Sequence, residues 1–360
     1  MVLSPEHRAL FSLLRAGLWE RDLDDLSVFP LDVVQWQEVY KFSVQQTVTG
    51  IVYRGLSFLP DDMLPPEALM MKWVAQVDRV EGLNAKMNSA LESLIEALRS
   101  KNLHPVLLKG QGIASLYEQP MLRECGDIDL YFASDGEQAA AQAMAEDEGC
   151  RVVKEADGAR AYVWKGVEVE QHDSLFDLHA PSLKAYLSYI YSKYGAEPDG
   201  PYGTNVLTPL LNLLQLNAHL LKHIIGHGVG LRQFCDLARA YHSYNGKYDK
   251  AELEEIYDRT GLKRWSKQLH AFLIDYIGVE PQELPSSEPA PHKACTLLEI
   301  VLEGGNFGKY GSRKAKPART AIGRKLVTFT AFFSHLGFSL RYAPKEACWT
   351  PVNLMIGNLR

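Results

Sequence analysis

The sequence predicts an α+β fold, in which a small mixed sheet is flanked by an N-terminal and a C-terminal helical region. Apolar residues recur at helical spacing through about the first hundred residues. Short apolar runs separated by glycine-containing turns follow, and helical spacing returns from Leu207. We therefore divide the chain into an N-terminal helical region (1–101), a core (102–180) and a C-terminal helical region (181–360).

The N-terminal region contains three expected helical stretches. Ser4 and Pro5 are typical of a helix start, because serine caps backbone N–H groups and proline suits the first helical position. A second stretch covers about 31–57, and a third begins near Pro66. Apolar residues at helical spacing along the third stretch, from Val77 to Leu98, indicate a face that packs against a core.

The core is expected to contain about five strands and two helices. The first expected strand is a short apolar run with a proline at its start, which is typical of a buried strand. The last alternates apolar and polar residues, as a half-buried strand does. The expected strands cover 104–108, 128–132, 150–155, 160–164 and 167–172, and the expected helices cover 113–117 and 135–148.

The C-terminal region is expected to be helical, with a loop at 304–308 and a basic tail. Seven lysines and arginines, and no acidic residue, lie between Lys309 and Lys325. Such a segment either attracts an anionic partner, such as RNA, nucleotide phosphates or a membrane surface, or simply stays solvated.

The composition indicates a globular protein of a reducing compartment. Of the 360 residues 46% are hydrophobic, which is enough for a large core, and the net charge of −6 argues against a general nucleic-acid coat protein. The five cysteines show no C-x-x-C spacing, which disfavours a disulfide framework or a zinc cluster. We find no secretory leader and no apolar run long enough for a transmembrane segment, so we expect a cytoplasmic protein.

Asp127 and Asp129 are the first candidates for chemistry. They lie two residues apart on an expected strand, so both carboxylates point to one face. Like charges held side by side repel each other, and burial increases the cost. A divalent cation would remove this conflict, and magnesium suits such oxygen ligands. A pair of this kind is a weak signal by itself, because a solvated strand end shows the same pattern.

The turn before these aspartates strengthens the signal. Lys109, Gly110 and Gln111 follow the first expected strand at the start of a helix, where backbone N–H groups and the helix dipole favour a phosphate. Lys109 could add a positive charge, although a plain strand-to-helix turn would look the same. Arg123 is expected either to contact a phosphate or to pair with an aspartate.

A third carboxylate is expected from a neighbouring strand. Glu168, Glu170 and His172 alternate with apolar residues and therefore share one face. Glu170 is our candidate for the third metal ligand or for the base that deprotonates an acceptor hydroxyl, and Glu168 is the reserve. His172 either orients a carboxylate or touches the substrate, and a solvated strand face is the alternative for all three.

These segments resemble the uncharacterised bacterial nucleotidyltransferase family of the DNA polymerase β-like superfamily. The resemblance covers about 100–240. It is carried by Leu107-Leu108-Lys109-Gly110, Leu116-Tyr117, Pro120, Arg123, Gly126-Asp127-Ile128-Asp129-Leu130, Val169-Glu170-Gln171-His172, His219, Lys222-His223, Gly230-Leu231-Arg232 and Asp236.

The resemblance implies transfer of a nucleoside monophosphate from an NTP, with ATP the first candidate, to an acceptor hydroxyl. Asp127, Asp129 and Glu170 would be the catalytic acids and would hold Mg²⁺, with two ions expected. The phosphates would lie near Lys109, Gly110 and Gln111. Two residues depart from the superfamily's pattern, since Gln111 replaces a usual serine and Glu170 replaces a usual aspartate.

Further polar residues of the helical region are expected near the same site. Lys222, Arg232 and Asp236 either line the nucleotide cleft or form a polar seam between the helices and the core. The acceptor stays open between a small molecule, a protein side chain and an RNA end. Two alternatives remain, namely a nucleotide-binding protein of this fold without catalysis and a toxin-like component that modifies a macromolecule.

Overall fold

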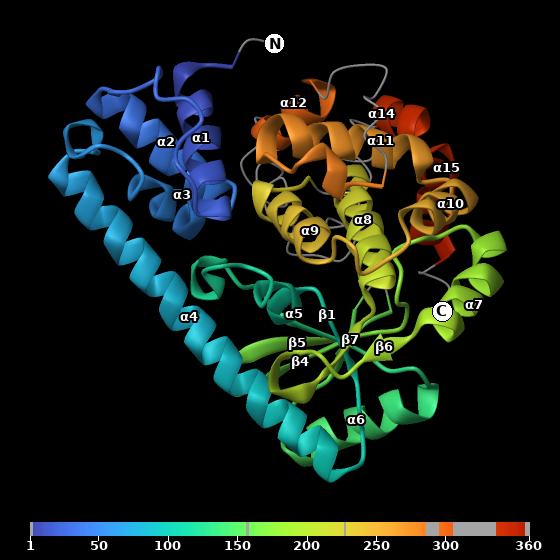
Figure 1. The fold of residues 1–360 in the computed structure, drawn as a ribbon. Coiled ribbons are helices and arrows are strands. Elements are labelled where there is room, and N and C mark those ends of the chain that lie inside the picture. Colours follow the sequence, from blue (N-terminus) through green and yellow to red (C-terminus); the bar gives the residue numbers. More distant parts are fainter. Residues whose placement is uncertain (1–2, 156–157, 227, 286–294, 305–335, 357–360) are drawn as a thin grey trace.

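The computed structural model describes residues 3–155, 158–226, 228–285, 295–304 and 336–356 (Figure 1). The basic tail at 309–325 and residues 305–308 of the expected loop lie outside the described residues. The fold is α+β, as the sequence predicts, with one mixed sheet between helical regions.

The N-terminal region is helical. The first helix begins as predicted, because the Ser4 side chain accepts a hydrogen bond from the His7 backbone and Pro5 opens the helix. The stretch expected as one helix at 31–57 is two, since Thr47 adopts a φ of 53° that a helix cannot continue through. The elements are α1 (Pro5–Trp19), α2 (Val33–Gln45), α3 (Thr49–Leu56), the 3₁₀ turn η1 (Asp61–Met63) and α4 (Glu67–Ser100).

The sheet contains all five expected strands, with a few shifted ends. They are β1 (Val106–Leu108), β2 (Ile128–Tyr131), β3 (Val153–Lys154), β4 (Arg160–Trp164) and β5 (Val167–His172). Between them lie α5 (Gly110–Ala114), the 3₁₀ turn η2 (Pro120–Leu122) and α6 (Asp135–Asp147). The helix expected at 113–117 therefore begins earlier, directly after the Lys109 turn.

Two further strands continue the sheet beyond residue 180. They are β6 (Ala196–Glu197) and β7 (Asn205–Leu207), and the strand order is β3-β4-β5-β2-β1-β7-β6. Strand β2 runs antiparallel to β1 and parallel to β5, while β7 runs parallel to β1. Segments of two or three residues are too short to show an alternating pattern, so sequence analysis missed them.

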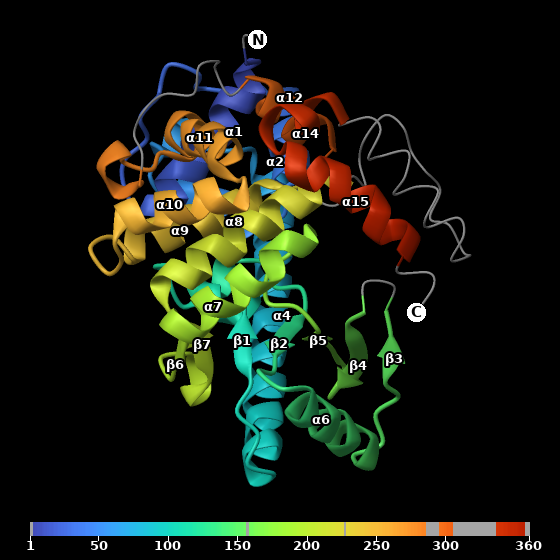
Figure 2. The ribbon, with the colours of Figure 1, turned by 90° about the vertical axis from the view of Figure 1, so that its right-hand side faces the viewer.

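The two faces of the sheet differ in polarity because side chains alternate along each strand. Ile128, Leu130 and Val169 pack against α4 and α6, where Leu91 and Leu94 are fully buried. Each such side chain contributes about 1.5–3 kcal/mol by leaving water. The intervening polar residues of β2 and β5 face the opposite side, toward the C-terminal helices. Figures 1 and 2 show α6 and the C-terminal helices on opposite sides of the sheet.

The C-terminal region packs mainly as helices over the polar face of the sheet (Figure 2). Its elements are η3 (Pro181–Leu183), α7 (Lys184–Tyr194), η4 (Pro201–Gly203), α8 (Pro209–Gly226), α9 (Leu231–Ser243), α10 (Lys250–Thr260), α11 (Lys263–Phe272), the π-helical turn η5 (Leu273–Ile277), η6 (Pro281–Glu283), α12 (Cys295–Gly304), α14 (Leu336–Tyr342) and α15 (Pro344–Ile356).

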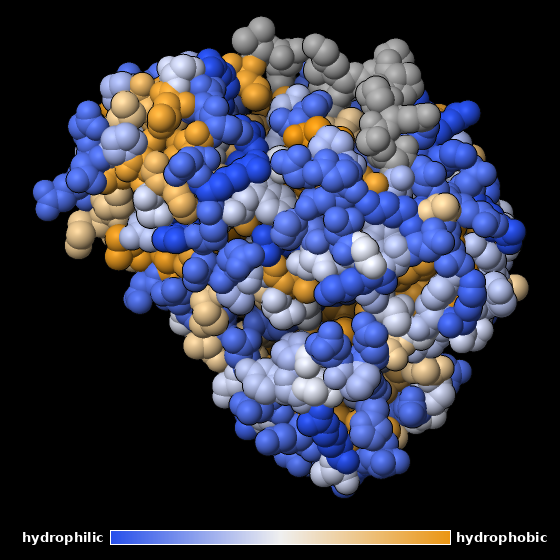
Figure 3. Space-filling model, in the orientation of Figure 1, coloured by the Kyte–Doolittle hydropathy of each residue, from blue (hydrophilic) through white to orange (hydrophobic). Residues whose placement is uncertain are grey.

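The surface is mostly polar, but it carries an apolar patch over the N-terminal helices. Figure 3 shows apolar side chains gathered over the N-terminal helices. Large apolar side chains that stay exposed in that region include Val33, Val34 and Met71. Within the described residues, no helix has the length and apolar character needed to cross a membrane.

Candidate active site

The turn between β1 and α5 lies against the start of β2. Lys109 and Gly110 both have positive φ angles, of 48° and 40°. A Cβ atom at Gly110 would lie 3.3 Å from the Asp127 carbonyl oxygen, so glycine suits both the angle and the close approach. The lysine conformation costs about 1–3 kcal/mol. Its ammonium lies 3.1 Å from Asp129 Oδ1, which ties the turn to β2.

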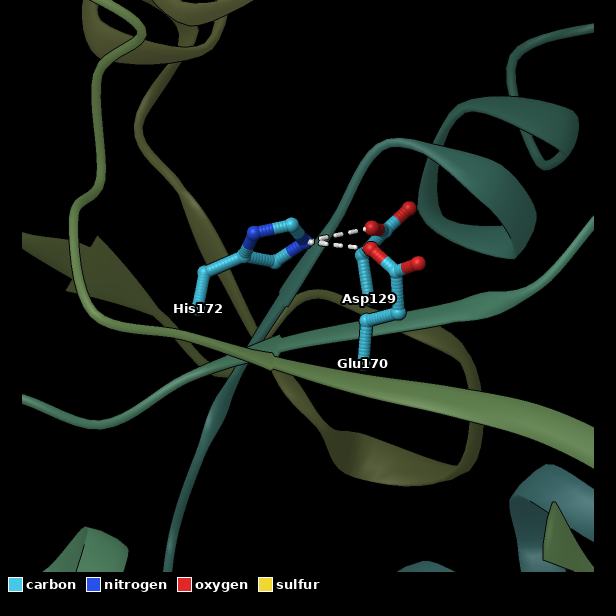
Figure 4. A group of neighbouring side chains, drawn as sticks. All are labelled: Asp129, Glu170 and His172. Atoms are coloured by element: carbon cyan, nitrogen blue, oxygen red, sulfur yellow. Dashed lines mark hydrogen bonds and ion pairs between the residues drawn. The ribbon is translucent and has the colours of Figure 1, made fainter. Parts of the chain in front are cut away.

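Two carboxylates of the candidate site come from neighbouring parallel strands. Asp129 on β2 is the direct cross-strand partner of Glu170 on β5. His172 Nε2 donates a hydrogen bond of 2.6 Å to Asp129 Oδ1 and lies 3.7 Å from Glu170 Oε2. Figure 4 shows the three side chains pointing toward one another. One potential ligand atom of each lies within 4.8 Å of those of the other two, so they could share a metal ion.

The carboxylates differ in how their surroundings affect their charge. Burial alone would raise the pKa of Asp129, but Lys109 and His172 outweigh it and hold that pKa well below its usual range. Burial, followed by the charges of Asp127 and Asp129, raises the pKa of Glu170 to about 7. The neighbouring Asp129 charge and burial also raise the pKa of Asp127. The site therefore holds more negative charge than its own cations offset.

These residues line a cavity of about 380 Å³ between the sheet and helices α8 and α9. Eight of the nine residues predicted for the site line it, namely Lys109, Gly110, Arg123, Asp127, Asp129, Glu170, Lys222 and Arg232. Gln111 does not, because its buried side chain donates a 2.5 Å hydrogen bond to Asn88 of α4. Glu168, the reserve acid, is exposed and also lies outside the cavity lining.

Arg123 forms its ion pair with Asp236 of α9, and not with Asp127 or Asp129. Its guanidinium binds both oxygens of Asp236 on α9, at 2.7 and 2.8 Å, and both side chains are buried. The Tyr117 hydroxyl donates a third hydrogen bond, of 2.7 Å, to Asp236 Oδ1. This cluster fastens the helical wall of the cavity to the segment that leads into β2.

Asp177 is a neighbour of the site that sequence analysis missed. Its carboxylate accepts hydrogen bonds of 2.8 Å from Lys222 Nζ and from His219 Nδ1, both on α8. His219 Nε2 in turn lies 2.9 Å from His223 Nε2. Burial and the Lys109 charge lower the pKa of His219 to about 4, so the imidazole is neutral at pH 7. Asp177 lies in an irregular segment after β5, where no local pattern distinguishes it.

Asn84 on α4 is a second residue that sequence analysis missed. Its side-chain amide donates two hydrogen bonds of 2.8 Å, to the carbonyl oxygens of Met121 and Arg123. The residue is buried in the apolar stripe of the helix. Its polar side chain within an apolar stripe is the feature of the sequence that could have indicated its role. The two hydrogen bonds hold the segment that leads to Asp127.

Comparison with known proteins agrees with the nucleotidyltransferase part of the resemblance seen in the sequence. Residues 32–273 match the model of a family described as uncharacterised nucleotidyltransferase. No curated protein and no solved structure shows a significant match. The family match spans about two thirds of the chain and includes β1, β2, β5, α8 and α9, which surround the cavity. The chain therefore belongs to the uncharacterised nucleotidyltransferase family, and it is a nucleotidyltransferase.

Proposed function

We propose that the protein transfers a nucleoside monophosphate from an NTP, with ATP the first candidate, to a hydroxyl group of an acceptor. The observation that carries the proposal is the convergence of Asp127, Asp129 and Glu170 on one cavity of a chain that belongs to a nucleotidyltransferase family. We also place the chain in the polymerase β-like superfamily, as the order of its Lys-Gly turn, D-x-D strand and acidic strand suggests.

The donor set fits magnesium. Asp127, Asp129 and Glu170 supply only oxygen atoms, which are the ligands that Mg²⁺ prefers. Repulsion from Asp129 is the main cause of the raised pKa of Asp127, and it adds to burial in raising the pKa of Glu170; a divalent cation would relieve this repulsion. When bound, Mg²⁺ ions would supply positive charge to the phosphoryl group under attack, and we propose two of them.

The chain's own residues then have separate tasks. His172 orients Asp129 through its hydrogen bond, and Lys109 remains charged and holds the turn in place. Glu170 either completes the set of metal ligands or, as the base, accepts the proton of the acceptor hydroxyl. The acceptor oxygen forms a bond to the α-phosphorus, and the bond from that phosphorus to the departing pyrophosphate breaks.

Transfer of label from α-labelled NTPs tests this proposal. The protein is incubated with each NTP, Mg²⁺ and separated small-molecule, protein and RNA fractions of a cell extract. We expect labelling of one fraction by the wild type and by Glu168→Gln, and none by Asp127→Asn or Asp129→Asn. Absence of transfer in every fraction, with nucleotide binding intact, would instead support a nucleotide sensor without catalysis.

The toxin-like alternative has a separate test. Expression of a toxin-like enzyme would arrest growth of the host, and Asp129→Ala would relieve the arrest. Normal growth with the wild-type protein would count against this alternative.

We also propose a cytoplasmic location, in line with the free thiols of Cys125, Cys150, Cys235 and Cys348.

A further inference from the structure

The cations that line the cavity are not equivalent. Four lysines and arginines of the described chain line it, and three of them already have a carboxylate partner. Lys109 pairs with Asp129 at 3.1 Å, Arg123 with Asp236 at 2.7 Å, and Lys222 with Asp177 at 2.8 Å. An anionic ligand would have to compete with these partners.

Arg232 on α9 is the fourth cation, and its surroundings differ. Within the described chain, no carboxylate forms an ion pair with it. Its Nη1 donates a 2.8 Å hydrogen bond to the Glu124 carbonyl oxygen, while its buried Nε has no hydrogen-bond partner. The Glu124 carboxylate accepts a hydrogen bond from the Thr49 backbone instead. Arg232 thus keeps donor capacity that the protein does not use.

The electrostatics of the two arginines show the same contrast. Burial would lower the pKa of Arg123, but Asp236 outweighs it and raises that pKa. For Arg232, burial and the nearby Arg123 charge lower the pKa by more than the charges of Asp236, Glu124 and Asp127 raise it. A guanidinium that is removed from water without an ion-pair partner is costly, and a bound anion would offset that cost.

The position of Arg232 indicates that the anion it would bind is a phosphate group. A Cβ atom at Gly126 would lie 3.9 Å from Arg232 Nη1, so the guanidinium lies beside the residue that precedes Asp127. A phosphate bound to this guanidinium would therefore lie near Asp127, whose charge acts on Arg232. The planar guanidinium suits phosphate because it offers paired N–H donors to two oxygens.

We infer that Arg232 binds the polyphosphate of the nucleotide and is the residue by which the cavity distinguishes a nucleoside triphosphate from a monophosphate. The inference rests on the proposed function and assigns to Arg232 the role that the Lys109–Gln111 turn was expected to fill. The turn holds the site together through its ion pair, and the Arg232 guanidinium, whose Nε has no hydrogen-bond partner, binds the ligand.

Calorimetric titration with tripolyphosphate, ATP and AMP in the presence of Mg²⁺ tests the inference. We expect Arg232→Gln to weaken tripolyphosphate and ATP by about 10- to 100-fold each, and AMP by less than about threefold. Arg232→Lys keeps the charge but loses the paired donors, so its affinities should fall between those of the wild type and Arg232→Gln. Arg259→Gln on the exposed surface of α10 makes the same change in net charge and should leave all three affinities unchanged.

Thermal melting separates ligand binding from a structural role. Without ligand, Arg232→Gln should melt near the wild-type temperature, and tripolyphosphate should raise its melting temperature less than that of the wild type. Equal ligand-induced shifts, or an AMP affinity that falls as far as the ATP affinity, would overturn the inference. Equal melting shifts would show that the Arg232 side chain does not bind polyphosphate. An equal fall in AMP affinity would show that Arg232 contacts a part of the nucleotide other than the terminal phosphates.

The same variants distinguish the failure of this inference from the failure of the proposed function. If Asp129→Asn abolishes label transfer while Arg232→Gln binds tripolyphosphate normally, the assignment of Arg232 is wrong and the transferase proposal stands. If no protein transfers label but Arg232→Gln still weakens tripolyphosphate binding, the assignment of Arg232 stands and the transferase proposal fails.

Discussion

Replacement of Asp236 by alanine should destabilise the protein strongly. The substitution removes two hydrogen bonds from Arg123, of 2.7 and 2.8 Å, and one of 2.7 Å from the Tyr117 hydroxyl. The Arg123 side chain is only 4% exposed, so its charge would stay buried without compensation. Removal of one partner from such a buried pair typically costs about 3–5 kcal/mol, and we expect the free energy of unfolding to fall by this amount.

Urea unfolding followed by tryptophan fluorescence measures this change. Asp258→Ala is the matched control, because the Asp258 side chain is 63% exposed and its ion pair with Lys263 should contribute less than about 1 kcal/mol. The double variant Arg123→Met/Asp236→Leu removes both charges and should be more stable than Asp236→Ala. A loss below about 1 kcal/mol for Asp236→Ala, or a double variant less stable than the single one, would refute the reasoning.

Three further predictions concern the site and its support. Glu170→Gln should lower label transfer by about 10²-fold or more, whereas exposed Glu168→Gln should keep most of it; equal losses would contradict the assignment of Glu170. Because the pKa of His219 is lowered from 6.5 to about 4, the folded protein takes up a proton less readily than the unfolded chain. The His219 contribution to stability is therefore complete above about pH 6.5 and is lost as the pH falls toward 4. His219→Gln should make the free energy of unfolding in urea less dependent on pH across this window. An unchanged pH dependence would count against this role of His219. Asn84→Ala removes the hydrogen bonds to the part-buried Met121 carbonyl and the buried Arg123 carbonyl. It should cost about 1–3 kcal/mol in the same unfolding assay, while a neutral result would mean that water replaces the amide.

The fold class and the strands of the core could be predicted from local patterns. The alternation in Val167–His172 correctly places Val169 in the apolar core and Glu170 toward the cavity, because successive side chains of a strand point to opposite faces. Short strands such as β7 and the helix break at Thr47 were missed. They depend on pairing with β1 and on a single backbone angle, and neither leaves a periodic signal.

The partners of the charged residues could not be predicted in the same way. The sequence left Arg123 open between a phosphate and an aspartate, and it contained no pattern that marks Asp177. The structure pairs Arg123 with Asp236, which lies 113 positions further along the chain, and it brings Asp177 to two residues of α8.

Local periodicity is enough to predict which residues of one strand share a face, since the two-residue period of a strand is a local property. It thereby predicted that Asp127 and Asp129 share one face and that Glu168, Glu170 and His172 share one face. Which cations already have a carboxylate partner depends on tertiary packing, because Lys222 meets Asp177 only when α8 packs beside the segment that follows β5. That packing leaves Arg232 without an ion-pair partner in the described chain, and this difference distinguishes it from the other cations of the cavity.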